Sequence, residues 1–123
     1  MVDLDSSFLI NSLAPESPEA VRVLEWLASG EALQISAVAW GEFLCGPLNP
    51  EDEAYARRIL PPARPLERID AERAAHLFNE TGRRSRSFAD CCIAASAIRI
   101  GAHLATGNED DFKRMVPHGL QLA

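Results

Sequence analysis

Short apolar runs alternate with longer stretches of helical periodicity in the first half of the chain. Residues 1–5 and 33–36 have the length and composition of short strands. The residues between and after them place apolar side chains at helical spacing. We expect a helix from Ser6 or Ser7, a second helix that restarts after Pro18 and ends at Gly30, and a third from Ser36 or Ala37 through Cys45.

The second half continues this alternation. A helix is expected between Pro50 and Pro61, followed by a short strand at 66–69 and a helix that Asp70 caps and Gly82 ends. A long apolar helix is expected from Ser87 to Ile100, followed by a strand at 102–105. Asn108 is expected to open the last helix, and residues 120–122 to form the last strand. Alternating strands and helices are typical of a parallel sheet with helices on both faces. The predicted fold is therefore a three-layer α/β fold with a mostly parallel sheet of about four to five strands.

Length and composition place the chain in one class. A chain of 123 residues with 47% hydrophobic residues fits a single globular domain, here residues 1–123. No apolar stretch reaches the ~18 residues of a membrane span, and MVDLDSS lacks the features of a signal peptide. We therefore expect a cytoplasmic protein without a membrane partner. Cys45, Cys91 and Cys92 are expected to be reduced, buried apolar residues.

The net charge of −6 argues against a nucleic-acid partner, but the charges are unevenly distributed. Residues 57–86 contain eight arginines and four acidic residues, a local charge of +4. Most of these arginines fit the solvated faces of helices. Arg83, Arg84 and Arg86 instead lie in the polar connection TGRRSRS, where their forked donors suit a phosphate backbone.

Acidic and amide residues recur where predicted strands pass into helices. They are Asp5, Glu42, Asp90, Asn108 and Asp111. Taken alone, Asp5 is explained better by helix capping than by catalysis. Capping explains Asp90 nearly as well as catalysis does, and it also accounts for much of the pattern at Asn108. Glu42 lies in a helix that is apolar on almost every side and is therefore expected to be buried. Its carboxylate would then bind a metal ion or pair with an arginine, or it would reach solvent at the rim of the fold. A parallel sheet brings such junctions together, and oxygen ligands without His or Cys select Mg²⁺ or Mn²⁺.

Four segments containing these residues resemble the acidic motifs of PIN domains, in the order of that family: LDSSFLI, SAVAWGEF, FADCCIAASA and LATGNEDDF. The resemblance spans nearly the whole chain and implies a PIN-like fold. It implies that Asp5, Glu42 and Asp90 are metal ligands with catalytic roles, completed by Asn108 or by Asp111, the latter also catalytic. Ser6 and Thr106 are expected to contact the substrate, together with the three arginines at 83, 84 and 86.

The function implied by the resemblance is that of an Mg²⁺-dependent endoribonuclease, with Mn²⁺ as a second suitable ion. The size is similar to that of VapC-type toxins of type II toxin–antitoxin systems. Such an enzyme hydrolyses an RNA phosphodiester by metal-activated water. The expected partners are an RNA substrate, a small cognate antitoxin and a second copy of the chain in a homodimer.

Two positions depart from the family pattern, and two other functions are consistent with the sequence. Ser6 and Ser7 stand where the family usually has Thr-Asn, and Asp3 occupies a strand position that is usually apolar. The segment from Asp3 to Ser7 also resembles the nucleophile loop of haloacid-dehalogenase-type phosphatases, although the only lysine, Lys113, follows the late acidic pair instead of preceding it. The other alternative is a non-catalytic partner-binding module in which the acids are helix caps.

Overall fold

A four-stranded parallel sheet forms the centre of the structure, a computed structural model that describes residues 1–123. The strand order is β2-β1-β3-β4, with β1 at Val2–Leu4, β2 at Leu33–Gln34, β3 at His103–Ala105 and β4 at Gln121–Leu122. Val2 pairs with Leu33 on one side and His103 on the other, and Leu104 pairs with Leu122. All pairs are parallel, which confirms the predicted α/β fold.

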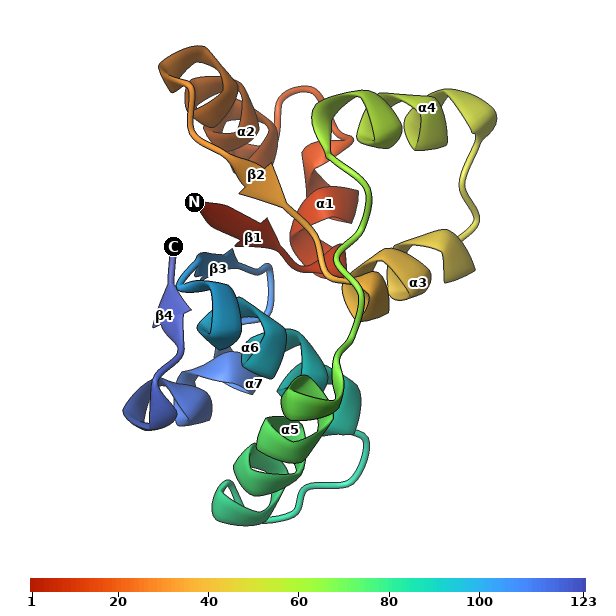
Figure 1. The fold of residues 1–123 in the computed structure, drawn as a ribbon. Coiled ribbons are helices and arrows are strands. Elements are labelled where there is room, and N and C mark those ends of the chain that lie inside the picture. The colour runs from red at the N-terminus through yellow and green to blue at the C-terminus, as the bar shows by residue number, and fades with distance from the viewer.

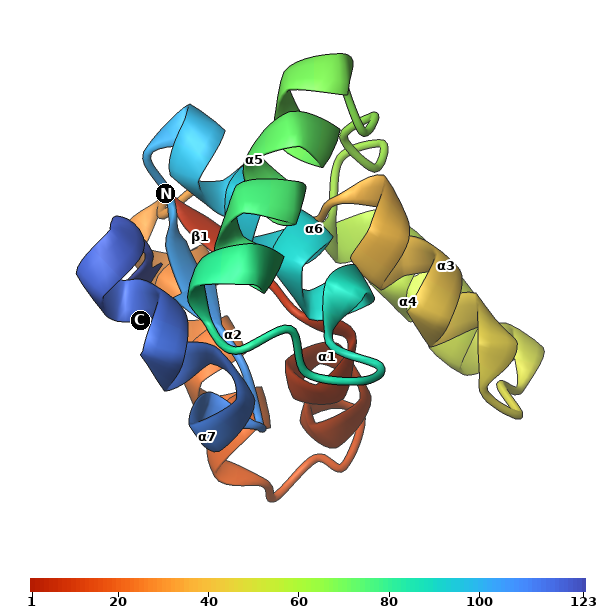
Figure 2. The ribbon, with the colours of Figure 1, turned by 90° about the horizontal axis from the view of Figure 1, so that it is seen from below.

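Helices cover both faces of this sheet (Figures 1 and 2). They are α1 (Ser6–Ser12), α2 (Pro18–Ser29), α3 (Ala37–Cys45), α4 (Pro50–Ile59), α5 (Arg68–Glu80), α6 (Phe88–Ile100) and α7 (Glu109–Phe112), which continues into the 3₁₀ helix η1 (Lys113–His118). Helices α1 and α2 pack together against one face, and α6 lies against the other with α5 packed along it. This arrangement follows from right-handed crossovers between parallel strands.

Local sequence signals set most helix boundaries. Ser17 caps α2 by accepting a hydrogen bond from the Ala20 N–H, and Pro18 occupies the first helical turn, where its missing donor costs nothing. Gly30 and Gly101 end α2 and α6 with φ values of 78° and 68°, a left-handed conformation that glycine adopts without steric cost. These signals were readable from the sequence.

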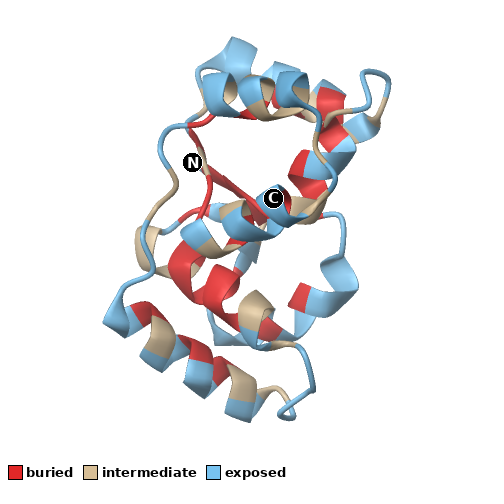
Figure 3. Ribbon diagram, turned by 90° about the vertical axis from the view of Figure 1, so that its right-hand side faces the viewer, coloured by how far each residue is buried: buried red, intermediate tan, exposed pale blue.

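The core lies between the sheet and α6 on one side and between the sheet and α1 and α2 on the other, as the buried positions in Figure 3 show. Seven consecutive residues of α6, Cys91 to Ala97, are buried, and their small side chains let this helix lie close to the strands. All three cysteines are free, as expected, but Cys45 is exposed, contrary to the expectation for that residue. None of the helices has the length and apolar character needed to cross a membrane.

Two predicted elements around residue 67 are wrong. Residues 66–69 do not form a strand, because α5 already begins at Arg68, and the only strand-like pairing nearby is an isolated parallel bridge between Ser36 and Arg64. The cap of α5 is Glu67, in a reciprocal capping box with Asp70 at the third helical position. Asp70 is buried and also accepts two hydrogen bonds from Arg99, at 2.7 and 3.0 Å.

Candidate active site

The candidate site lies at the carboxyl edge of the sheet, where β1 and β3 end side by side. Asp5 follows β1 directly and caps α1, and its N–H donates to the carbonyl oxygen of Ala105 at 2.9 Å. Thr106 follows β3, which pairs with β1 through Leu4 and Ala105. The first and fourth sequence motifs, about a hundred residues apart in the chain, are therefore neighbours because two parallel strands are neighbours.

The Asp5 carboxylate is fixed by hydrogen bonds from both strand ends. It accepts from the Ser6 N–H, the Ser7 hydroxyl and the Thr106 hydroxyl, each at 2.8 Å, and Asp5 is only 3% exposed. The Thr106 hydroxyl oxygen also accepts from the Asn108 N–H at 3.0 Å. A buried carboxylate with these donors stays in one orientation, as a metal ligand requires. Thr106 thus orients Asp5, in addition to the substrate contact predicted for it.

Ser7 is a site residue to which the sequence analysis assigned no role. Its hydroxyl donates to Asp5 and accepts from the Gly107 N–H at 3.0 Å, so it joins α1 to the turn after β3. A Cβ atom at Gly107 would lie 2.8 Å from Asn11 Nδ2 and 3.3 Å from Ser7 Oγ, so a larger residue there would force these side chains to shift. The departure from Thr-Asn at residues 6 and 7 was the available signal for Ser7.

Glu42 approaches the site from α3 and is exposed, so the expected burial is wrong and the alternative of a rim position is the one observed. Helix α3 turns Ala39 and Phe43 into the core and leaves Glu42 at the rim. The Ser6 hydroxyl donates to the Glu42 carboxylate at 3.3 Å. Partial desolvation of this carboxylate and the charge of Asp5 raise the Glu42 pKa, and the Ser6 bond opposes the rise. The Glu42 carboxylate therefore belongs to the same electrostatic cluster as Asp5.

Asp90 is the carboxylate at which the charges of the site converge. It is half-buried in the first turn of α6, and desolvation together with the charges of Asp5, Glu42 and Asp111 raises its pKa to about 6. The capping interpretation of Asp90 fails, because the Ser87 side chain makes no capping bond and the Ser87 N–H donates to the Arg84 carbonyl oxygen. Asp90 is thus held near three other acids without a compensating local bond.

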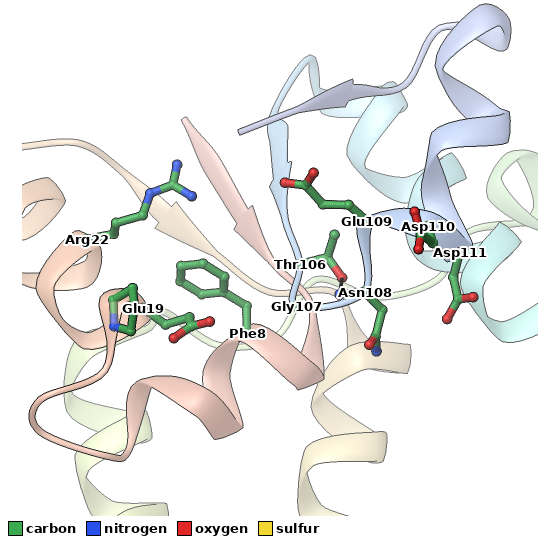
Figure 4. A pocket seen from close by; sticks show the side chains of 10 residues that line it. Phe8, Glu19, Arg22, Thr106, Gly107, Asn108, Glu109, Asp110 and Asp111 are labelled. Atoms are coloured by element: carbon green, nitrogen blue, oxygen red, sulfur yellow. Dashed lines mark hydrogen bonds between the residues drawn. The ribbon is translucent and has the colours of Figure 1, made fainter.

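Asn108 and Asp111 occupy the turn and short helix that follow β3. Both line a cleft of about 660 Å³, and Figure 4 shows their side chains pointing to the same side while Glu109 points across the cleft towards Arg22. Asn108 does not cap α7 with its side chain. Asp111 lies near enough to Asp90 for its charge to raise the Asp90 pKa.

The donor set fits a hard divalent cation by its chemistry. Oxygen atoms are the only donors in the cluster, and no basic side chain forms an ion pair with Asp5, Glu42, Asp90 or Asp111. In the conformation shown, no three acidic, His or Cys side chains converge closely enough to hold an ion. A shared ion would therefore require the side chains of Glu42, Asp90 and Asp111 to change position, whereas hydrogen bonds hold Asp5 in place.

The three arginines of the α5–α6 loop are not equivalent. Arg84 and Arg86 line a cavity of about 210 Å³ together with Asp90 and Asp111. Arg83 instead donates to the Asn79 side chain at 3.2 Å and lies over the Phe78 ring, at the end of α5.

Asp3, the unexpected acid in β1, has a structural explanation. It is fully buried and pairs with Arg64, which donates to the Asp3 carboxylate at 2.7 Å and to the Ser96 hydroxyl of α6 at 2.9 Å. A buried, ion-paired Asp3 is not available as a covalent nucleophile. This geometry removes the basis for the phosphatase alternative.

Comparisons with known proteins agree with this geometry. The sequence model of the PIN domain family matches residues 3–116, and the chain therefore belongs to the PIN domain family. No curated protein matches the chain.

Several solved structures share the fold. The structure of VapBC2 from Rickettsia felis, bound to a promoter DNA fragment, matches with a TM-score of 0.77 at 19% identity. The match covers 100% of this chain and 98% of that chain. VapBC-1 from nontypeable Haemophilus influenzae has a TM-score of 0.70 at 21% identity, covering 100% and 97%. A toxin–antitoxin complex from Klebsiella pneumoniae has a TM-score of 0.67 at 21% identity, covering 91% and 90%.

Proposed function

We propose that this chain is an Mg²⁺-dependent endoribonuclease and the toxin component of a toxin–antitoxin pair, acting in the cytoplasm. The observation that carries the nuclease proposal is that Asp5, Glu42 and Asp111 lie near enough to Asp90 at the carboxyl edge of the sheet for their charges to raise its pKa. Clusters of mutually repelling carboxylates cost stability and are expected where function requires them. Membership of the PIN domain family supports a nuclease activity.

The proposed reaction is hydrolysis of an RNA phosphodiester by water. Asp5, Glu42, Asp90 and Asp111, with the Asn108 amide at the rim, would hold Mg²⁺ or Mn²⁺, which lowers the pKa of bound water and neutralises charge on the phosphate. The hydroxyl groups of Ser7 and Thr106 hold the Asp5 carboxylate in one orientation. Asp90 or Glu42 orients the attacking water, and the Ser6 hydroxyl, beside Glu42, contacts the substrate.

A direct experiment compares RNA cleavage by the purified protein in Mg²⁺ and after EDTA treatment, with Asp90→Asn as the matched variant. The proposal expects cleavage only in Mg²⁺ and a loss of activity in Asp90→Asn. Equal cleavage rates in EDTA and in Mg²⁺ would contradict metal-dependent catalysis. A folded wild-type protein that cleaves no RNA but binds a partner would support the non-catalytic alternative.

The proposed partner is a small antitoxin, and we expect the toxin to form a homodimer. The similar solved structures from Rickettsia felis, Haemophilus influenzae and Klebsiella pneumoniae support the antitoxin proposal, because they are VapBC or toxin–antitoxin assemblies. A cavity of about 300 Å³ beside α1, α2 and α4, lined in part by Leu13, Leu24 and Tyr55, offers an apolar surface. The antitoxin is expected to insert a basic side chain near the acidic cluster.

Co-expression with small proteins encoded next to this chain tests the partner. A cognate antitoxin should co-purify and inhibit cleavage. If no neighbouring frame encodes a small protein and no candidate co-purifies, the toxin assignment is wrong even where the nuclease activity stands.

A further inference from the structure

We propose that Arg84 and Arg86, without Arg83, form a phosphate-binding wall that faces Asp90 and holds the RNA backbone on one side of the acidic cluster. This inference rests on the proposed nuclease function, since it takes the bound phosphate to be that of the substrate. It also says on which side of the acidic cluster the RNA backbone runs: over the α5–α6 loop, and not through the larger cleft beside α2.

Two residues of the α5–α6 loop, Arg83 and Arg86, have an unusual backbone conformation. Arg83 and Arg86 have φ values of 53° and 67°, in the left-handed region that non-glycine residues rarely adopt. The loop is compact, because the Arg83 N–H donates to the Phe78 carbonyl oxygen at 2.9 Å and the Ser87 hydroxyl donates to the Arg84 carbonyl oxygen at 2.8 Å. Such strain is common at ligand-binding segments and costs stability. A purely structural loop would favour glycine at residue 86.

Every residue that lines the cavity beside Arg84 and Arg86 is polar or charged. Its walls are Arg84, Ser85, Arg86, Ser87, Asp90 and Asp111, and none of them is hydrophobic. Because the Ser87 hydroxyl bonds to Arg84, the first turn of α6 has no side-chain cap. Guanidinium forks and free N–H groups at a helix start are both favourable partners for a phosphate.

Arg84 and Arg86 make no ion pair or hydrogen bond with the protein through their side chains, although the net charge of −6 provides many acids. By contrast, Arg64 and Arg99 are paired with buried aspartates. Arg83 bonds to Asn79, as described above. The donors of Arg84 and Arg86 are therefore available to a bound anion, and those of Arg83 are partly occupied.

The larger cleft on the other side of Asp111 does not suit a polyanion. It contains one cation, Arg22, and four acids, Glu19, Glu109, Asp110 and Asp111. The Arg22 guanidinium lies 4.6 Å from the Trp26 ring centroid and 5.7 Å from that of Phe8, so it is engaged in stacking. Asp111 lines both cavities, and the charge of the walls changes from mixed to acidic across it.

The test measures binding of a labelled single-stranded RNA in an Asp90→Asn background as a function of salt. Each lost phosphate contact should reduce the slope of log K against log salt by about 0.7. Arg84→Ala and Arg86→Gly should each show this reduction, and the double variant about twice as much. Arg83→Ala, together with Arg73→Ala as an exposed arginine on α5 and Arg22→Ala as the cation of the larger cleft, should leave the slope unchanged.

Arg86→Gly is chosen because glycine adopts the left-handed conformation freely. Its melting temperature should equal or exceed that of the parent, so that weaker binding is not a consequence of unfolding. An unchanged salt slope in the double variant, or an equal loss in Arg83→Ala and Arg73→Ala, overturns the phosphate-wall inference. If the wild type cleaves no RNA in Mg²⁺ but the arginine-dependent slope persists, the nuclease proposal fails and the phosphate site remains.

Discussion

Asp90 lies in the first turn of the core helix α6, where burial and the charges of three other acids raise its pKa. Its folded-state pKa of about 6 lies above the ordinary value of 3.8, so proton binding favours the folded, metal-free protein. The stability that Asp90 contributes through proton binding is complete below about pH 4 and is lost as the pH rises through about 6. Burial of the Asp90 carboxylate, together with its acidic neighbours, therefore destabilises the metal-free protein at neutral pH.

Asp90→Asn should remove this cost. In EDTA at pH 7 we expect the free energy of unfolding to be unchanged or higher by roughly 0.5–2 kcal/mol, while RNA cleavage in Mg²⁺ is lost. Relative to the wild type, the variant should also gain stability as the pH rises from 4 to 7, because it lacks the contribution of Asp90 that is lost over this range. Chemical denaturation across this pH range measures both effects. Wild-type cleavage by Asp90→Asn at wild-type stability would show that Asp90 has no catalytic role.

Ser7 and Ser6 provide a matched pair for testing how Asp5 is positioned. Ser7→Ala removes a donor to Asp5 and the acceptor for the Gly107 N–H, and should lower stability by about 0.5–1.5 kcal/mol and reduce cleavage. Ser6→Ala loses only the 3.3 Å bond to the exposed Glu42 and keeps its N–H bond to Asp5, so its stability should change less. Thermal melts and cleavage rates of both variants decide this. A larger stability loss in Ser6→Ala would contradict the assigned positioning role of Ser7.

Among the elements, strand β1 depends on a buried ion pair with the segment between α4 and α5. Asp3 is buried and Arg64 is the side chain that joins it to Ser96 of α6. Desolvation raises the Asp3 pKa and the Arg64 charge opposes the rise, and one carboxylate oxygen has no partner at all. Any loss of Arg64 leaves an uncompensated charge between the sheet and α6.

Arg64→Met should therefore destabilise the fold by about 3–5 kcal/mol, the cost of a buried charge that has lost its partner. The double variant Asp3→Leu/Arg64→Met removes both charges and should recover most of this loss. Urea unfolding of the single and double variants measures the coupling. If the double variant is no more stable than Arg64→Met, the ion pair is not the reason for the arginine at this position.

These elements also show what the sequence could predict. Apolar periodicity together with Pro and Gly signals located β1, α2 and α6, because their boundaries depend on local chemistry. The start of α5 was misplaced, since Glu67 is an uncommon cap and the apolar Leu66 and Ile69 imitated a strand. The Asp3–Arg64 contact joins residues 61 positions apart in the sequence and had no local signal.

For the site, motif order was enough to predict which acids gather at one sheet edge, but not their individual surroundings. Glu42 is exposed because α3 lies at the rim of the fold and turns Phe43 inward, an orientation set by tertiary packing. The division of the loop arginines likewise depends on the backbone conformation at Arg83 and Arg86, which composition does not determine.

At the scale of the whole molecule, the proposed metal site links cation binding to folding, because the carboxylates that would hold the ion come from four separate segments of the chain. A ligand that binds only the folded state adds about 1.4 kcal/mol of stability for each tenfold increase in concentration above its dissociation constant. We expect Mg²⁺ to raise the melting temperature of the wild type. The effect should be larger at pH 8 than at pH 5, because an Asp90 with a pKa of about 6 must lose its proton to bind the ion.

Glu109→Gln supplies the control for this last prediction. Glu109 lines the larger cleft, and its charge is not among those that raise the Asp90 pKa. Its Mg²⁺-dependent stabilisation should match that of the wild type, whereas Asp90→Asn should show little stabilisation at either pH. If Mg²⁺ stabilises Asp90→Asn as much as the wild type, the ion binds elsewhere. The acidic cluster would then be a source of strain without being the metal site.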